Sequence, residues 1–118
     1  MVQAAVRGDR SDTPAIDHAH LSRMTAGDVA LERELLDLFD TQAALLLGRM
    51  HGGDSATVSA LAHTLKGSAL GIGAGAVARA AGVLERAGAD QDAALLRLTI
   101  AVQEAHLAIA ALLARSCE

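Results

Sequence analysis

The feature that most limits the fold of this chain is an apolar composition almost without aromatic rings. Hydrophobic residues make up 52% of its 118 residues but aromatic residues only 1%, with one phenylalanine and no tryptophan or tyrosine. Leucine, valine, isoleucine and alanine must therefore fill the interior. Alanine and leucine favour helices, whereas sheets favour β-branched and aromatic side chains. The composition predicts an all-α fold, and the length fits one domain with a single core.

Capping residues and glycines divide the chain into five predicted helices. Asp17, preceded by Ile16, can cap a short helix over 17–24, and Asp28 can cap a long helix over 29–50. The third helix begins after the glycine pair at 52–53, with Asp54 or Ser55 as its cap, and runs to about residue 70. The last two helices are expected over about 76–87 and from about 93 to the end, with a turn at 88–90 between them.

Long helices joined by short turns form bundles. The prediction is an antiparallel up-down-up-down four-helix bundle over residues 15–118 with a short extra N-terminal helix, preceded by a flexible tail over residues 1–14.

Apolar stripes at helical spacing predict which faces of the two longest helices are buried. In the 29–50 helix the expected core stripe is Leu31, Leu35, Leu38, Phe39, Gln42, Leu46 and Met50. In the last helix it is Ala93, Leu96, Ile100, Gln103, Leu107, Ala110 and Leu113, flanked by Leu95, Leu98, Val102, Ile109 and Leu112. A second stripe of Leu36, Ala43 and Leu47 either packs on another helix or joins a surface where a partner docks.

Charge and cysteine content exclude several classes of function. The formal net charge is −4 without a cluster of lysine and arginine, which argues against nucleic-acid binding and favours a protein partner. Cys117 is the only cysteine, so we expect an incidental thiol near the chain end and no multi-cysteine metal site. Residues 1–15 lack the apolar core of a signal peptide, and no apolar run approaches the ~20 residues of a membrane span. We expect a soluble, cytoplasmic protein.

One histidine stands out by its neighbours. At ~100° of rotation per residue, Lys66, Gly67 and Leu70 lie on the same helix face as His63. The apolar residues of this helix gather on the opposite face: Val58, Leu61, Ala62, Leu65, Ala69 and Ile72. His63 should therefore point to solvent, where a neutral imidazole is a nucleophile that can attack phosphorus without a helper base.

The residues around His63 fit a phosphorylated side chain. Lys66 can balance the added negative charge from one helical turn away. Gly67 costs roughly 1 kcal/mol relative to alanine in a helix interior, so its lack of a side chain should serve access for an incoming protein. Ser68 lies at the edge of the buried face and can bond to a carbonyl one turn earlier, which gives it a structural role.

These residues carry a family resemblance. His63, Lys66, Gly67, Ser68, Ala69, Gly73 and Ala74, with Leu84 and Glu85 about one helix later, resemble the histidine-containing phosphotransfer (HPt) domain of bacterial phosphorelays. Outside this motif the resemblance covers about residues 17–115 through helix lengths and apolar spacing. The chain departs from it at Ala80, Ala81 and Gly82, where larger apolar side chains are usual.

The resemblance implies a phosphocarrier. His63 would accept a phosphoryl group at Nε2 from an aspartyl phosphate of one receiver domain and pass it to the aspartate of another. The partners would be response regulator receiver domains and a hybrid histidine kinase, with Leu70 and nearby apolar residues helping a receiver to dock. The receiver would supply the acidic pocket and Mg²⁺, so the chain needs no cofactor or metal of its own. Without a nucleotide-binding fold we expect no autophosphorylation and no kinase activity. We also expect a monomeric protein.

Other motifs are weaker. The glycines of 71–76 match a loose dinucleotide fingerprint, but that motif needs a preceding strand, and residues 65–70 continue a helical stripe instead. His18, His20, His51 and His106 lack the spacing of bundle metal ligands and are expected at the surface or in turns. A helical adaptor that binds a signalling partner without transferring phosphate, and a small metal-binding bundle, remain as alternatives.

Overall fold

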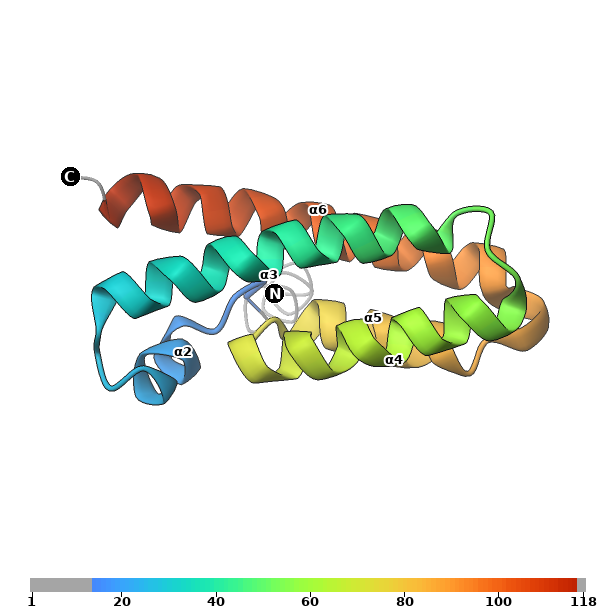
Figure 1. Cartoon of the computed structure of the whole chain (residues 1–118), viewed down its shortest axis with the longest axis horizontal. Helices are drawn as coiled ribbons and strands as arrows, with labels where there is room; N and C mark the ends of the chain where they lie inside the picture. Colours follow the sequence, from blue (N-terminus) through green and yellow to red (C-terminus); the bar gives the residue numbers. More distant parts are fainter. Residues whose placement is uncertain (1–13, 117–118) are drawn as a thin grey trace, which may run out of the picture.

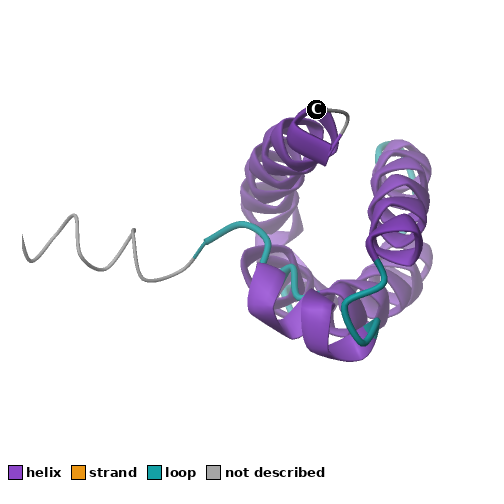
Figure 2. Ribbon diagram, turned by 90° about the vertical axis from the view of Figure 1, so that its left-hand side faces the viewer, coloured by secondary structure: helices purple, strands orange, loops and turns teal. Residues whose placement is uncertain are grey.

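The computed structural model describes residues 14–116, and within this range the chain is helical with no strand. Its α-helices are α2 (His18–Met24), α3 (Val29–Met50), α4 (Ser55–Ile72), α5 (Gly75–Glu85) and α6 (Gln91–Ser116), with the short 3₁₀ turn η1 (Gly88–Asp90) before α6. In Figure 1, α3 and α6 lie along the upper edge, α4 and α5 along the lower edge, and α2 at one end. The all-α prediction is confirmed, and Figure 2 shows the described part of the chain as helices joined by loops, with no strand. The expected tail before residue 14 and the thiol of Cys117 lie outside the described residues.

Three aspartates begin three of the helices, and at the third Asp54 rather than Ser55 is the cap. The carboxylates of Asp17, Asp28 and Asp54 each accept a hydrogen bond from the backbone N–H three residues later, at 3.1, 3.1 and 2.8 Å. Each bond satisfies an amide that the helix itself leaves unpaired. The hydrogen bond from Thr57 holds the pKa of Asp54 below its ordinary value.

Gly73 ends α4 in a left-handed conformation (φ +85°) and meets the chain that enters α2. The N–H of Asp17 donates to the Gly73 carbonyl at 2.8 Å. A Cβ on Gly73 would lie 3.0 Å from the backbone oxygen of Asp17. Backbone conformation and close approach therefore both require glycine here. α4 continues two residues beyond the predicted end at Leu70 because this left-handed residue, rather than Gly71, terminates it.

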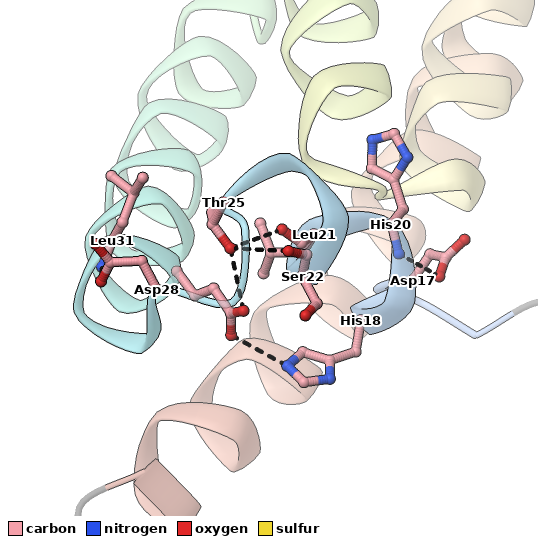
Figure 3. Close-up of polar contacts among 9 residues, drawn as sticks. Asp17, His18, His20, Leu21, Ser22, Thr25, Asp28 and Leu31 are labelled. Carbon is pink, nitrogen blue, oxygen red and sulfur yellow. Dashed lines mark hydrogen bonds and ion pairs between the residues drawn. The ribbon is translucent and has the colours of Figure 1, made fainter.

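Polar contacts fasten α2 to the ends of α3 and α4. Figure 3 shows the cluster in which Nε2 of His18 lies 3.2 Å from Oε1 of the buried Glu32. The Thr25 hydroxyl shares its single proton between the Leu21 carbonyl at 3.0 Å and Oε2 of Glu32 at 3.2 Å. Nε2 of His20 lies 3.2 Å from the carbonyl oxygen of Gly71. These histidines have structural partners, in agreement with their expected location at the surface.

The core lies between four long helices and is built from small and branched apolar side chains. α4 buries the six residues that the sequence assigned to its core face: Val58, Leu61, Ala62, Leu65, Ala69 and Ile72. α5 packs most extensively on α4, and its buried positions include Ala78, Ala81 and Gly82. Small residues let two helix backbones come close. The small residues of α5 therefore allow this helix to pack closely against α4, the helix that carries His63.

The predicted stripe of α3 is only partly buried, and that of α6 is exposed. On α3, Phe39, Leu46 and Met50 of the predicted stripe belong to the core, as do Leu36 and Ala43 of the second stripe. Leu31 and Leu38 of the predicted stripe are exposed. On α6 the buried residues are Ala94, Leu98, Ala101, Val102, Ala105 and Ile109, whereas the predicted stripe of Leu96, Ile100 and Leu107 faces solvent. Both helices are apolar on two faces, so periodicity alone could not select one. The alanines of the α6 face allow closer packing than the larger side chains opposite.

Candidate functional site

His63 lies near the middle of α4, on the face opposite the core. Its side chain is 68% exposed, whereas Leu65, two residues away, is completely buried. The helix that carries it is capped at both ends, by Asp54 and by Gly73. A rigid, well-packed helix therefore presents the imidazole to solvent, as the sequence predicts.

Glu85, the last residue of α5, bridges His63 and Lys66. Its Oε2 lies 2.8 Å from Nδ1 of His63, and its Oε1 lies 3.0 Å from Nζ of Lys66. Oε1 is shielded from solvent, and its contact with the ammonium is an ion pair rather than a well-aligned hydrogen bond. One carboxylate thus fixes both side chains of the predicted site.

Contacts between α4 and α5 hold Glu85 and Lys66 in place. The Ser59 hydroxyl, one turn before His63, donates to the backbone carbonyl of Glu85 at 2.9 Å and so ties the end of α5 to α4. Gly82 is buried beneath the Lys66 side chain, where a Cβ would lie 3.5 Å from Cδ of Lys66. The lysine chain thus packs against the backbone of α5 at Gly82, one turn before Glu85.

The charge of Glu85 selects the tautomer of His63. The Lys66 ammonium beside Glu85, and secondly the hydrogen bond with His63, hold the pKa of this carboxyl below its ordinary value. The carboxylate is therefore ionised at neutral pH and can only accept hydrogen bonds. A neutral His63 must then carry its proton on Nδ1, which leaves the lone pair on Nε2.

Gly67 leaves open space beside the imidazole. No heavy atom lies within 4 Å of the position that a Cβ on Gly67 would take, and the same holds for Gly71 one turn later. Between α2, α3 and α4 lies a cavity of about 500 Å³ lined by Met24, Leu35, Leu38, Phe39, Gln42, Ser68, Gly71 and Ile72. Ser68 is half-buried at its edge.

The predicted docking residues are only partly at the surface. Leu70 is 59% exposed on the histidine helix. Leu36 and Ala43 belong to the core and are not accessible to a partner, which corrects their assignment. Leu47 lies in the groove between α3 and α6, on the side of α3 away from α4. The reason is the orientation of α3 described above. Its exposed leucines are instead Leu38, which lines the cavity beside α4, and Leu45, which follows seven residues later on the same face of α3.

Sequence reasoning gave Glu85 no role of its own. The signal was present, because Glu85 is the sole acidic residue among the eleven of α5 and ends that helix. Its distance from His63 depends on how α4 and α5 pack, which spacing along the chain does not show.

The two remaining histidines, His51 and His106, lie on other parts of the surface. Nδ1 of His106 lies 2.9 Å from the Asp40 carboxylate, and His51 is exposed at the end of α3. Within residues 14–116 no group of three or more histidine, cysteine or acidic side chains is placed to hold a metal ion.

Comparison with known proteins agrees with this site. The family model described as the Hpt domain matches residues 27–115, and the chain belongs to this family. The structure is similar to the crystal structure of the histidine phosphotransferase ShpA from Caulobacter crescentus, with 37% identity and a TM-score of 0.67 over 87% of this chain and 94% of that one. No curated protein sequence matches significantly. The family and the structural match support a phosphocarrier role in a phosphorelay.

Proposed function

We propose that this protein carries a phosphoryl group on Nε2 of His63, between the aspartates of receiver domains. The observation that carries the proposal is the arrangement of the two ring nitrogens: Nδ1 is held by Glu85 at 2.8 Å, while the side chain is 68% exposed. A nucleophile that must meet a second protein face to face needs this exposure, and it needs a fixed tautomer more than a deep pocket.

The transfer step follows from the tautomer. The Nε2 lone pair attacks the phosphorus of the aspartyl phosphate, the bond between phosphorus and the aspartate oxygen breaks, and the aspartate leaves as a carboxylate. His63 keeps its proton on Nδ1, so the ring becomes cationic as the new bond forms. Glu85 lies against that nitrogen and stabilises the developing positive charge. The reverse sequence loads the next receiver.

Lys66 balances the charge of the transferred group. Its ammonium now pairs with Glu85, one helical turn from the imidazole. A phosphoryl group on Nε2 adds nearly two negative charges, which can draw the flexible lysine from the carboxylate toward the phosphoryl oxygens. Lys66→Ala should slow transfer and leave the helical content unchanged.

The receiver docks on the exposed face around His63. Gly67 and Gly71 give it bare backbone to approach, and Leu70, Leu38 and Leu45 supply apolar contact. The proposed partners are response regulator receivers and a hybrid histidine kinase in the cytoplasm, and the receiver brings its own Mg²⁺. We also infer an up-down-up-down order for the four long helices, which the course of the colours in Figure 1 supports.

The test is transfer from a phosphorylated receiver. Incubation with a radiolabelled receiver should place acid-labile, base-stable label on the wild-type protein and none on His63→Gln. His106→Gln is the matched control, because His106 is also exposed and also holds a carboxylate through Nδ1. Label that persists in His63→Gln refutes the site. Binding to receivers without any label would favour the adaptor instead.

A further inference from the structure

The outer face of α6 carries an apolar stripe that no part of the bundle covers. It consists of Ala93, Leu96, Ile100, Gln103, Leu107, Ala110 and Ala114, all exposed. Its large members, Leu96, Ile100 and Leu107, are 62%, 49% and 67% exposed. Successive members are alternately three and four residues apart. This is the spacing of a seam between two paired helices.

The stripe is separate from the core face of the same helix. Residues such as Leu98 and Ile109, on the opposite side of α6, are completely or almost completely buried. α6 is therefore apolar on two faces. Because of these two faces, the segment Gly88–Arg115 is long and apolar enough by composition alone to cross a membrane. Only 28% of its most apolar window is buried in the bundle, so much of this apolar surface is exposed.

We propose that two copies of this chain associate through this stripe, with their α6 helices antiparallel. In the register that places the stripe residues of one copy opposite those of the other, Leu96 faces Leu107 of the second copy. Ile100 then faces Gln103, and Ala93 faces Ala110. Each layer pairs residues whose numbers sum to the same value, so a single twofold axis near residues 101–102 generates all of them.

Charge complementarity supports the second copy and the antiparallel direction. Arg97 and Glu104 are seven residues apart and lie on one edge of the stripe. In the antiparallel pair, Arg97 of each copy comes within one turn of Glu104 of the other, which gives two equivalent ion pairs. Neither side chain has an ion-pair partner within residues 14–116. A lipid surface would leave Glu104 unpaired.

The size of the seam indicates a weak dimer. A helix of 26 residues is about 39 Å long and, at a width of about 11 Å, presents roughly 430 Å² of projected surface per copy. Specific interfaces commonly bury about 800 Å² of accessible surface per partner, and smaller ones belong to transient complexes. We therefore expect association in the micromolar range.

The dimer leaves the phosphoryl site free. α4 and α6 are diagonal in the bundle, because each packs on α3 and on α5. The stripe points away from the core on the α6 side, and His63 is exposed on the α4 side. A dimer formed through α6 would carry two accessible histidines on its outer surfaces.

Sedimentation or light scattering over about 1 μM to 1 mM tests the association. The wild type should shift from monomer to dimer, and Leu107→Asp should remain monomeric. Leu45→Asp is the matched control, because Leu45 is 66% exposed on α3 and lies outside the stripe; it should still dimerise. A wild type that stays monomeric throughout, or a monomer that binds phospholipid vesicles through Leu107, overturns the proposal.

Two sets of variants test the register. Arg97→Glu and Glu104→Arg should each weaken the dimer, and the double variant should restore it. In a Cys117→Ser background, Leu96→Cys combined with Leu107→Cys should form an intermolecular disulfide, and Leu96→Cys alone should not. Efficient cross-linking of Leu96→Cys alone, or no rescue by the double charge reversal, overturns the antiparallel pairing.

Discussion

Glu85 Oε2 lies 2.8 Å from Nδ1 of His63, so the carboxylate that ends one helix decides which nitrogen of the neighbouring helix is free. The same carboxylate binds the Lys66 ammonium 3.0 Å away. The nucleophile and its counter-charge are therefore positioned by one residue.

Replacing Glu85 should slow transfer without removing the nucleophile. Glu85→Gln can still accept a hydrogen bond from Nδ1 but loses the negative charge that stabilises the cationic ring, so we expect a reduction of about tenfold in the transfer rate. Single-turnover transfer from a phosphorylated receiver measures the rate, and ¹⁵N chemical shifts of His63 report its tautomer. An unchanged rate together with an unchanged tautomer would show that Glu85 does not act on the ring.

Acid should remove the contribution of Glu85 to stability. The pKa of this carboxyl is lowered in the folded protein, so its ionised form stabilises the fold. This stabilisation is fully present above the ordinary pKa of a glutamate. It is lost as the pH falls through the lowered value. The difference in urea midpoint between wild type and Glu85→Gln should therefore shrink below about pH 4.5. Asp54, whose pKa is also lowered, is present in both proteins and cancels. A difference that persists undiminished at about pH 2 contradicts this account.

Gly67→Ala should raise the stability of the protein and slow phosphoryl transfer. No atom lies near the added methyl group, and alanine favours the helix, so the free energy of unfolding should rise by up to about 1 kcal/mol. The methyl group would nevertheless stand where the receiver approaches, and transfer should fall about tenfold. Gly48→Ala is the matched control, since Gly48 is also helical, exposed and without neighbours; it should leave transfer unchanged. Equal transfer rates for the two variants would mean that Gly67 provides no access.

Two leucines on α3 test its corrected orientation. Leu36 is 3% exposed, so Leu36→Ala should destabilise the fold by about 2–5 kcal/mol. Leu38 is 61% exposed, so Leu38→Ala should change stability by less than about 0.5 kcal/mol but weaken binding to a receiver. Chemical denaturation and a binding titration give the two quantities. The reverse pattern would restore the prediction from sequence.

The sequence predicts this fold well where a local rule applies. Asp17, Asp28 and Asp54 begin helices because a side-chain oxygen beside free amides is stabilising in any context. The core face of α4 follows from periodicity because only one of its faces is apolar. α3 and α6 have two apolar faces each, and the choice between them depends on neighbours that the sequence does not display.

The site divides in the same way. His63, Lys66 and Gly67 share a face because three or four residues make one helical turn, so spacing alone places them together. Glu85 is 22 residues from His63 along the chain and reaches it only because α5 packs closely on α4. Contacts between helices are set by packing, and they are the part that sequence reasoning missed.

One consequence of the exposed ring concerns the direction of signalling. The same nitrogen, Nε2, both accepts and donates the phosphoryl group, since Nδ1 is bound to Glu85. Loading and unloading must pass through the same geometry, and the carrier has no means of favouring either. The relative stability of the acyl phosphates on the two receivers therefore sets which way the signal travels, and the carrier equilibrates between them.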